Sequence, residues 1–294
     1  MIVITGASGQ LGYAIVRSLL SSSGPNGLVA TMRDPAKGGD LQALGVEVRQ
    51  ADFNHKDNLE QAFAGATQVL MVSSNARASG GGALAQHRNA IEAASSAGVG
   101  RIVYTSQMAA SAQSAFPPAQ DHAATEAMLA ASGLRWTALR NGFYAASGLQ
   151  FINDLLKGID LDLPADGRTA WTAHADLADA AAAILLSDGR FEGPTPPLTA
   201  SEALDFSELT QMVAELSGKP LQRTVCTEEQ FAQALQARGI PQGAVRMILG
   251  YYQASRNGEF TKTDPTLETL IGRKPITMSQ IVGEALAADR RITV

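Results

Sequence analysis

The sequence predicts an α/β fold, in which a doubly wound parallel sheet is covered by helices on both faces. Six short apolar runs rich in β-forming residues occur in its first half, at 2–5, 28–32, 46–51, 67–72, 101–105 and 135–140. Stretches rich in Ala, Leu and Gln lie between these runs and favour helices, at 10–21, 56–64, 84–97 and 120–132. Strands that alternate with helices over short connections are typical of a parallel sheet.

The second half of the chain predicts a smaller, mainly helical lobe. Helices are expected at 145–157, 174–187, 205–217, 227–238 and 241–256, and proline-rich loops interrupt them. We therefore divide the chain into a first domain over residues 1–145 and a smaller lobe over 146–294. We expect this lobe to be intertwined with the sheet.

Composition indicates a folded protein and excludes several classes of partner. Of the 294 residues, 45% are hydrophobic and 17% are charged, against about 25% charged in an average protein. The net charge of −5 predicts no nucleic-acid partner, because binding phosphates requires a basic face. The most apolar stretch, Leu177 to Leu186, is too short to span a bilayer, so no membrane partner is expected. A lone Cys226 cannot form an internal disulfide, which favours a reducing compartment and a cytoplasmic location.

A glycine-rich loop begins where the first strand ends and leads into the first helix. It comprises Gly6, Ala7, Ser8, Gly9, Gln10, Leu11 and Gly12. Its spacing G-x-x-G-x-x-G is one residue longer than the dinucleotide fingerprint G-x-G-x-x-G. Glycines allow a tight turn and let backbone N–H groups approach a pyrophosphate at a helix N-terminus. The place of this loop between a strand and a helix predicts a Rossmann-type dinucleotide site.

Residues after the second strand are expected to select the cofactor. A carboxylate at this point suits the ribose of NAD, whereas a cation suits the 2′-phosphate of NADP. Asp34 directly precedes Pro35 and is therefore expected to act as a helix N-cap. Arg33 and Lys37 are then left to face a phosphate, which Arg can bind in bidentate fashion. The sequence therefore favours NADP(H).

Two further strand ends supply candidate cofactor contacts. Asp52 and Phe53 follow the third strand, where they either contact adenine or, for Phe53, pack in the core. Ser73, Ser74 and Asn75 follow the fourth strand, where they either line the cofactor or merely begin a loop.

The chain lacks the Tyr-x-x-x-Lys pair that many folds of this kind use to protonate a carbonyl oxygen. None of its five tyrosines has a lysine four residues further on. Reduction of a simple ketone leaves an alkoxide, whose conjugate acid resembles water with a pKa of about 15.7. Reduction of a quinone leaves a phenolate-like anion with a conjugate pKa near ~10, which amounts to roughly 8 kcal/mol less help from an acid. The absent pair therefore favours a quinone, or a cationic dye, over an unactivated ketone.

Other chemistries have little support in the sequence. The four histidines, at positions 55, 87, 122 and 174, show no metal-ligand spacing, so no metal is expected. The chain contains neither a G-x-S-x-G elbow nor a phosphate-binding Walker A sequence.

Five segments together resemble the NmrA-like group of atypical short-chain dehydrogenases/reductases. They are 2–12, 33–37, 48–53, 86–89 and 139–144. Within this group the segments are most similar to the bacterial NADPH-dependent quinone reductases, with the triphenylmethane-dye reductases as near relatives. The resemblance runs from residue 1 to about 190 and continues more faintly to Gly272.

The resemblance implies a set of site residues around a nicotinamide. It places Thr105 and the segment from Asn141 to Tyr144 beside the ring, Phe143 included, and it marks Ser106 as the active-site serine. Asn141 and Tyr144 are the other candidate catalytic residues: an amide that binds a quinone oxygen or the nicotinamide amide, and a weak proton donor. Asn141 alternatively only caps the strand end, and Phe143 and Tyr144 alternatively pack in the core.

His122 and Glu126 occupy the stretch where typical members of the group keep their Tyr and Lys. This departure argues against ordinary alcohol dehydrogenase chemistry, in agreement with the missing pair.

Two functions from different classes follow. The first is an NADPH-dependent oxidoreductase that passes a hydride to a quinone or another flat electrophile. The second is a redox sensor that binds NADP(H) without turnover, since the group includes such regulators. An extended nucleotide-sugar epimerase is excluded because it needs the Tyr/Lys pair. Relatives form small assemblies, which leaves a homodimer open.

Overall fold

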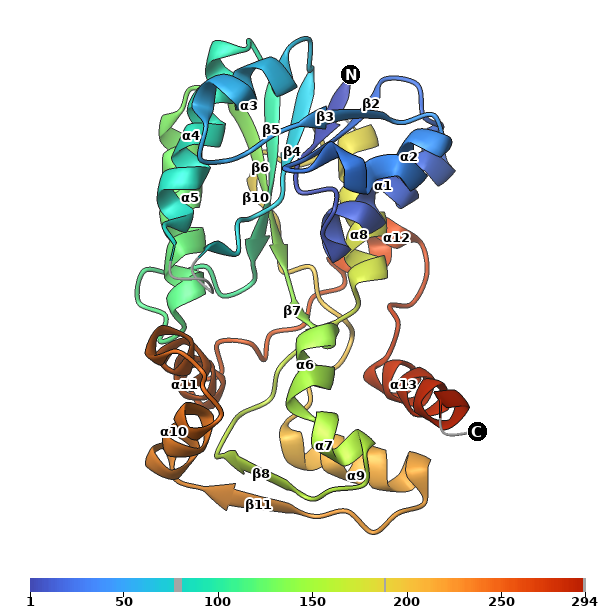
Figure 1. The fold of residues 1–294 in the computed structure, drawn as a ribbon, viewed down its shortest axis with the longest axis vertical. Helices are drawn as coiled ribbons and strands as arrows, with labels where there is room; N and C mark the ends of the chain where they lie inside the picture. Colours follow the sequence, from blue (N-terminus) through green and yellow to red (C-terminus); the bar gives the residue numbers. More distant parts are fainter. Residues whose placement is uncertain (77–80, 188, 293–294) are drawn as a thin grey trace.

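The computed structural model describes residues 1–76, 81–187 and 189–292, and its largest feature is a parallel sheet (Figure 1). Seven strands of the described chain form this sheet, in the order β10-β6-β5-β4-β1-β2-β3. They are β1 (Ile2–Ile4), β2 (Leu28–Met32), β3 (Glu47–Gln50), β4 (Gln68–Met71), β5 (Arg101–Gln107), β6 (Arg135–Asn141) and β10 (Gly193–Pro194). Each strand pairing among the described residues of this sheet is parallel, which confirms the predicted doubly wound α/β fold.

The strand order reverses between β1 and β4. Strands β1 to β3 wind outward in one direction, and β4 to β6 wind outward in the other. In sheets of this kind a ligand binds outside the carboxyl ends of the strands at the reversal. The topology therefore predicts a ligand site at the carboxyl ends of β1, β4 and their neighbours.

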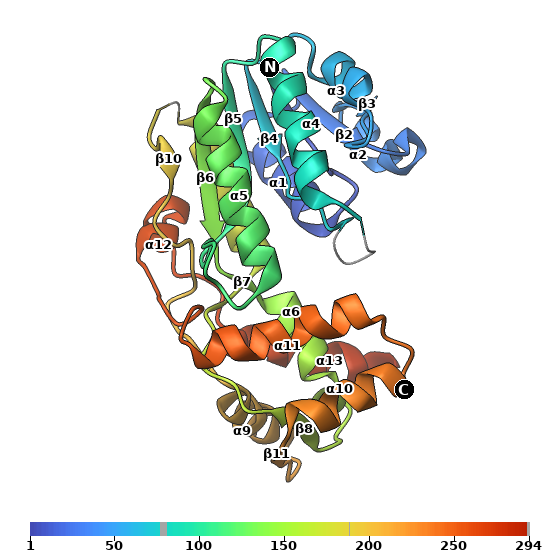
Figure 2. The ribbon, with the colours of Figure 1, turned by 90° about the vertical axis from the view of Figure 1, so that its left-hand side faces the viewer.

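Helices cover both faces because successive strand residues point to opposite sides. Val3 belongs to one core and its neighbour Ile4 to the other. One face carries α1 (Gln10–Ser23), α8 (His174–Leu186), α12 (Thr266–Ile271) and the short η1 (Pro35–Gly38) and α2 (Gly39–Ala43). The other carries α3 (Lys56–Phe63), α4 (Ala83–Ser96) and α5 (Pro117–Ala131). Figure 2 shows α4 and α5 in front of the sheet, with α1 behind it.

A second lobe lies beyond the carboxyl ends of the strands (Figures 1 and 2). Its elements are β7 (Phe143–Tyr144), α6 (Ala145–Phe151), α7 (Asn153–Leu156), β8 (Leu161–Pro164), β9 (Trp171–Thr172), α9 (Phe206–Ser217), β11 (Arg223–Cys226), α10 (Glu228–Ala237), α11 (Gln242–Arg256) and α13 (Met278–Ile292). A third core, rich in aromatic residues such as Trp171, Phe206 and Tyr251, holds this lobe together. Strands β8 and β11 form a small parallel sheet, and β7 pairs with β9.

The predicted elements are correct in place but differ in extent. The helix expected over 145–157 is two helices, because the backbone at Ile152 leaves helical geometry with φ −96° and ψ 15°. The strand expected over 101–105 continues to Gln107. After residue 145 the chain returns to the first domain, where α8 packs on α1 and β10 pairs with β6. The division at residue 145 itself stays a prediction.

Among the described helices, none combines the length and the apolar character needed to cross a membrane.

Candidate active site at the carboxyl ends of the strands

The glycine-rich loop is built for close approach to the first turn of α1. Gly6 has φ +62°, a conformation that glycine adopts at no steric cost. A Cβ on Gly12 would lie 2.4 Å from the carbonyl oxygen of Gly6, so a larger residue does not fit there. Gly9, the N-cap of α1, offers no side chain to bond the first N–H groups of the helix. Those N–H groups are therefore free to bind an anion.

The segment after β2 separates a structural carboxylate from two exposed cations. The Asp34 side chain accepts a hydrogen bond from the backbone N–H of Ala36 at 3.2 Å, which confirms its predicted role as an N-cap. The side chains of Arg33 and Lys37 are exposed, and no ion pair to either occurs within the described chain. These two cations remain available to a phosphate.

The predicted adenine-contact residues serve the local structure. The carboxylate of Asp52 accepts hydrogen bonds from the backbone N–H of Asn54 at 2.9 Å and from its Nδ2 at 3.0 Å. Phe53 packs partly buried against the core beneath α3 and α4. The structure thus shows the packing alternative for Phe53, and a contact with adenine stays a prediction.

A cavity of about 340 Å³ opens at the carboxyl ends of β4, β5 and β6, within the size range of small-molecule sites. It brings together seven of the predicted site residues, namely Ser73, Ser74, Asn75, Ser106, Asn141, Phe143 and Tyr144. Eleven further residues complete its lining: Ala83, His87, Tyr104, Gln107, Phe116, Pro118, Asp121, His122, Gly142, Ser147 and Met247. The glycine-rich loop and Arg33 are not among the lining residues.

Thr105 on β5 holds the loop after β4 in place. Its side chain is fully buried, and its hydroxyl accepts a hydrogen bond from the backbone N–H of Ser73 at 2.8 Å. The same hydroxyl donates to Ser73 Oγ at 3.3 Å. Thr105 therefore holds the loop after β4 and does not itself line the cavity.

His87 on α4 also holds this loop, in a defined tautomer. Its Nε2 accepts a hydrogen bond from the backbone N–H of Ser74 at 2.9 Å, so the ring proton lies on Nδ1. Nδ1 then donates to Thr125 Oγ1 at 2.8 Å, and the Thr125 hydroxyl donates to the carbonyl oxygen of Asp121. Burial lowers the pKa of His87 to about 4, although the Asp121 charge opposes the shift. The imidazole is therefore neutral at pH 7.

A second histidine pairs with a buried tyrosine. His122 Nδ1 lies 2.7 Å from the hydroxyl oxygen of Tyr104, and the two groups share a hydrogen bond. Burial lowers the pKa of His122 to about 3, and nearby His87 lowers it further. Burial raises the pKa of the Tyr104 hydroxyl. At neutral pH, His122 is uncharged and Tyr104 keeps its proton.

Ser106 is part of a charged network between β5, α5 and β6. Its hydroxyl donates to Glu126 Oε1 at 2.6 Å, and Arg140 Nη2 binds Glu126 Oε2 at 2.7 Å. Because the only hydroxyl proton of Ser106 is given to Glu126, Ser106 presents lone pairs to the cavity. The predicted catalytic role of Ser106 stays a prediction.

The aromatic segment after β6 lies between the sheet and the lobe. The ring of Phe143 contacts those of Trp171, Tyr251 and Phe260, with centroid distances of 5.5, 5.0 and 5.1 Å. Tyr144 packs against the ring of His174 at 4.4 Å. Burial raises the pKa of the Tyr144 hydroxyl, and a hydrogen bond from the Asn141 side chain partly offsets this shift. Both aromatic side chains also line the cavity, so core packing and a ligand contact are compatible.

Sequence reasoning missed several residues at the cavity. Gln107 was not predicted because the expected strand stops at residue 105, whereas β5 continues to residue 107. Extending the strand by two residues would have identified Gln107 as a polar residue at a strand end. His87 stands in the sequence only as one of four histidines without metal-ligand spacing, and nothing local indicates that it meets Ser74.

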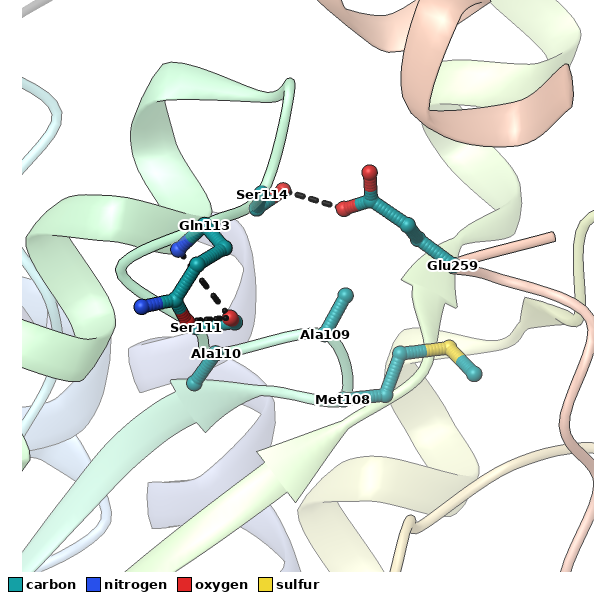
Figure 3. A pocket seen from close by; sticks show the side chains of 7 residues that line it. All are labelled: Met108, Ala109, Ala110, Ser111, Gln113, Ser114 and Glu259. Atoms are coloured by element: carbon teal, nitrogen blue, oxygen red, sulfur yellow. Dashed lines mark hydrogen bonds between the residues drawn. The ribbon is translucent and has the colours of Figure 1, made fainter. Parts of the chain in front are cut away.

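A second depression, of about 410 Å³, lies between the loop after β5 and the lobe (Figure 3). In Figure 3 the side chains of Ser114 and Glu259 point toward each other, and the Ser114 hydroxyl donates to the Glu259 carboxylate. Ser111 similarly donates to Gln113 at 3.1 Å. The polar groups of this depression thus bond to each other, and the bond between Ser114 and Glu259 ties the loop after β5 to the second lobe. Within the described residues, no group of His, Cys, Asp and Glu is arranged to hold a metal ion.

Comparisons with known proteins identify the family of the chain. Residues 6–188 match the model of a family described as NAD(P)H-binding. Quinone oxidoreductase 2 of Escherichia coli is 36% identical over 283 residues, which cover 96% of this chain and 97% of the relative. An NmrA-like family domain-containing oxidoreductase of Aspergillus flavus is 28% identical, over 98% of this chain and 95% of the relative.

Two solved structures share the whole fold. The NADPH-dependent quinone oxidoreductase of Escherichia coli complexed with NADPH has a TM-score of 0.89 at 36% identity, covering 97% of this chain and 99% of that one. The Citrobacter sp. triphenylmethane reductase complexed with NADP(H) has a TM-score of 0.87 at 31% identity, covering 97% and 100%. These matches confirm the resemblance read from the sequence motifs. The chain therefore belongs to the NAD(P)H-binding family and, within it, to the NmrA-like group.

Proposed function

We propose that the protein is an NADPH-dependent oxidoreductase that passes a hydride to a quinone or a similarly flat electrophile. The observation that carries this proposal is the protonation state of four side chains that line the cavity at the ends of β4, β5 and β6. Burial keeps His87 and His122 uncharged, with pKa values of about 4 and about 3. It also raises the pKa of Tyr104 and Tyr144. At pH 7 the two neutral imidazoles and the two weakened phenols are poor proton donors, which suits a quinone better than an unactivated ketone.

The residues present fit a dinucleotide phosphate. The close contact at Gly12 and the uncapped N-terminus of α1 suit a pyrophosphate. The exposed cations Arg33 and Lys37 suit a 2′-phosphate, and the cavity lies on the opposite side of the strand reversal. When bound, NADPH supplies the hydride.

The protein's own part is to position the acceptor and to exclude water. Phe143 and Tyr144 line the cavity with flat aromatic surface, against which a planar acceptor stacks. The Tyr144 hydroxyl, protonated because burial raises its pKa, donates a hydrogen bond to the acceptor oxygen. After hydride transfer the phenolate-like anion takes its proton from solvent. Such positioning in a cavity poor in water lowers the barrier without an enzymic acid.

The named activities of the relatives support this choice of acceptor. One is a quinone oxidoreductase and the other a triphenylmethane reductase, and both names describe the reduction of an aromatic or quinoid molecule. A cytoplasmic location and a homodimer belong to the same proposal, the first because the sequence holds a single cysteine.

The first experiment measures NADPH oxidation with 1,4-benzoquinone, beside NADH, a no-acceptor control and the simple ketone acetone. We expect rapid turnover of the quinone with NADPH, slower turnover with NADH, and none with the ketone. Binding of NADPH without any turnover of quinone or dye would instead identify a redox sensor and refute the oxidoreductase.

A further inference from the structure

Two buried amide groups at the cavity have an atom without a partner. Gln107 Nε2 and Asn141 Oδ1 make no hydrogen bond in the structure. The two residues are only 9% and 2% exposed, and both line the cavity. A buried donor or acceptor without a partner is unfavourable, and each case in a folded protein calls for an explanation.

Neighbouring contacts set the orientation of both amides. Gln107 Oε1 accepts a hydrogen bond from the backbone N–H of Ala109 at 2.8 Å, so Nε2 is the atom left over. The Asn141 side chain donates toward the Tyr144 hydroxyl, whose pKa it lowers, and this leaves Oδ1 as its free atom. The site therefore offers one donor, from Gln107, and one acceptor, from Asn141.

The two amides are neighbours by sheet register. Gln107 and Asn141 face each other as the last paired residues of β5 and β6. Adjacent strands lie about 4.8 Å apart, and paired residues point to the same face of the sheet. The two side chains therefore leave the same face of the sheet on adjacent strands, at the cavity that both of them line.

A ligand that satisfies both atoms must carry an acceptor and a donor close together. A quinone oxygen is an acceptor only, so it would pair with Gln107 and leave Asn141 Oδ1 unsatisfied. A primary carboxamide has a carbonyl oxygen and an NH₂ group on one carbon, so it pairs with both.

We propose that Gln107 and Asn141 bind the carboxamide of the nicotinamide ring. Gln107 Nε2 donates to the carboxamide oxygen, and the carboxamide NH₂ donates to Asn141 Oδ1. This assignment deepens the proposed function and rests on it. Two hydrogen bonds from adjacent strands stop the ring from rotating, and they leave the aromatic side of the cavity to the acceptor.

The test compares the binding of three compounds by fluorescence titration. They are NADP⁺, its 3-acetylpyridine analogue and adenosine 2′,5′-bisphosphate. The analogue replaces the NH₂ group with a methyl group and so loses only the bond to Asn141. The bisphosphate lacks the nicotinamide and reports on the adenosine end of the site and on folding. The variants are Asn141→Leu, which removes the acceptor, and Gln107→Met, which removes the donor without adding charge.

In the wild-type protein we expect NADP⁺ to bind about tenfold more tightly than the acetylpyridine analogue. Asn141→Leu removes this preference. Gln107→Met keeps the preference, but it weakens both dinucleotides about tenfold, and the bisphosphate binds equally to all three proteins.

Equal binding of NADP⁺ and its analogue to the wild-type protein would overturn the assignment before any variant is made. So would full discrimination in Asn141→Leu. If neither NADP⁺ nor the bisphosphate binds the wild-type protein, the proposed function itself fails. The two failures are thus distinguishable.

Discussion

A backbone hydrogen-bond donor fixes the tautomer of His87, because the N–H of Ser74 points at its Nε2. His122 is likewise held by one partner, the Tyr104 hydroxyl. Both rings are buried enough to lose their charge, with pKa values of about 4 and about 3. Imidazoles that elsewhere titrate near neutrality serve here as fixed, uncharged hydrogen-bonding groups.

We predict that His122→Asn leaves quinone turnover within about tenfold of wild type, because the neutral His122 does not act as a general acid. Loss of a general acid would instead reduce turnover about 10²–10⁴-fold. The side-chain oxygen of Asn replaces Nδ1 opposite Tyr104. The pH profile of kcat should show no inflection from His122 between about pH 5 and 8, since its pKa lies far below. A loss above about 100-fold in a folded variant would contradict this.

The same pKa values have a consequence for stability. Between the folded pKa values and the ordinary value near 6.5, the unfolded chain binds more protons, so the free energy of unfolding rises with pH. The cost of burying each neutral imidazole is absent above about pH 6.5 and grows below it, by at most about 1.4 kcal/mol per pH unit. In urea titrations this slope should be shallower in His122→Asn than in wild type between about pH 4 and 6.

Arg33 is the residue at which cofactor choice is predicted. Removing a guanidinium that binds a phosphate costs about 1.5–3 kcal/mol, so Arg33→Ala should weaken NADPH binding about 10–100-fold. NADH lacks the 2′-phosphate, and its binding should change little. Lys157→Ala, which removes an exposed cation from the other lobe, is the matched control. Equal losses for NADPH and NADH would refute the assignment to the 2′-phosphate.

At the scale of elements, α4 and β5 together hold the loop after β4. His87 binds the backbone of Ser74, and Thr105 binds that of Ser73. The chain thus fixes a loop that carries predicted cofactor contacts, through side chains that come from two other elements. Such support lets a loop present its polar groups in one arrangement.

Two substitutions of His87 separate its two contacts. In His87→Gln, the side-chain amide reaches the position of the His87 Nε2 and keeps the hydrogen bond to the Ser74 backbone. In His87→Asn, the shorter amide reaches only the position of Nδ1 and keeps the hydrogen bond to Thr125. We expect His87→Gln to bind NADPH within about threefold of wild type and His87→Asn to bind it about tenfold more weakly, since a buried N–H then lacks its acceptor. Titration with NADPH checks this, and equal affinities of the two variants would contradict it.

Elements with local signals could be predicted from the sequence, and elements that depend on distant partners could not. The apolar runs of β1, β2 and β5 identify strands by themselves, as does the glycine-rich loop before α1. Strands β8 and β11 pair across some sixty residues of chain, with Leu161 opposite Arg223. In β8 an exposed Asp162 interrupts two leucines, and in β11 Thr224 and Val225 are exposed, so their pairing is what makes them strands.

The same limit applies to the candidate site. Ser106, Asn141 and Tyr144 were found because they follow recognisable strands and carry a family resemblance. Gln107 and His87 were missed, since their importance lies in which atoms face them. Only the three-dimensional structure reveals that Gln107 Nε2 lacks a partner and that the imidazole of His87 has two.

At the scale of the whole molecule, the two lobes meet around the cavity. The sheet supplies the polar strand ends, and the second lobe supplies Met247 on α11 and Ser147 on α6. Glu259 binds Ser114 and the backbone N–H of Ala115, so the far part of the chain is fastened to the loop after β5. Changes in the lobe therefore reach the cavity through direct contacts.

The return of α8 to the first domain also governs the order in which the protein can fold during synthesis. Leu11, Ile15 and Leu19 on α1 form one core with Leu177 on α8 and Leu267 on α12. A nascent chain that ends at residue 145 carries this apolar face of α1 without the helices that cover it. The first domain therefore cannot close on the ribosome before most of the chain has emerged, and until then its uncovered face is a natural binding surface for a chaperone.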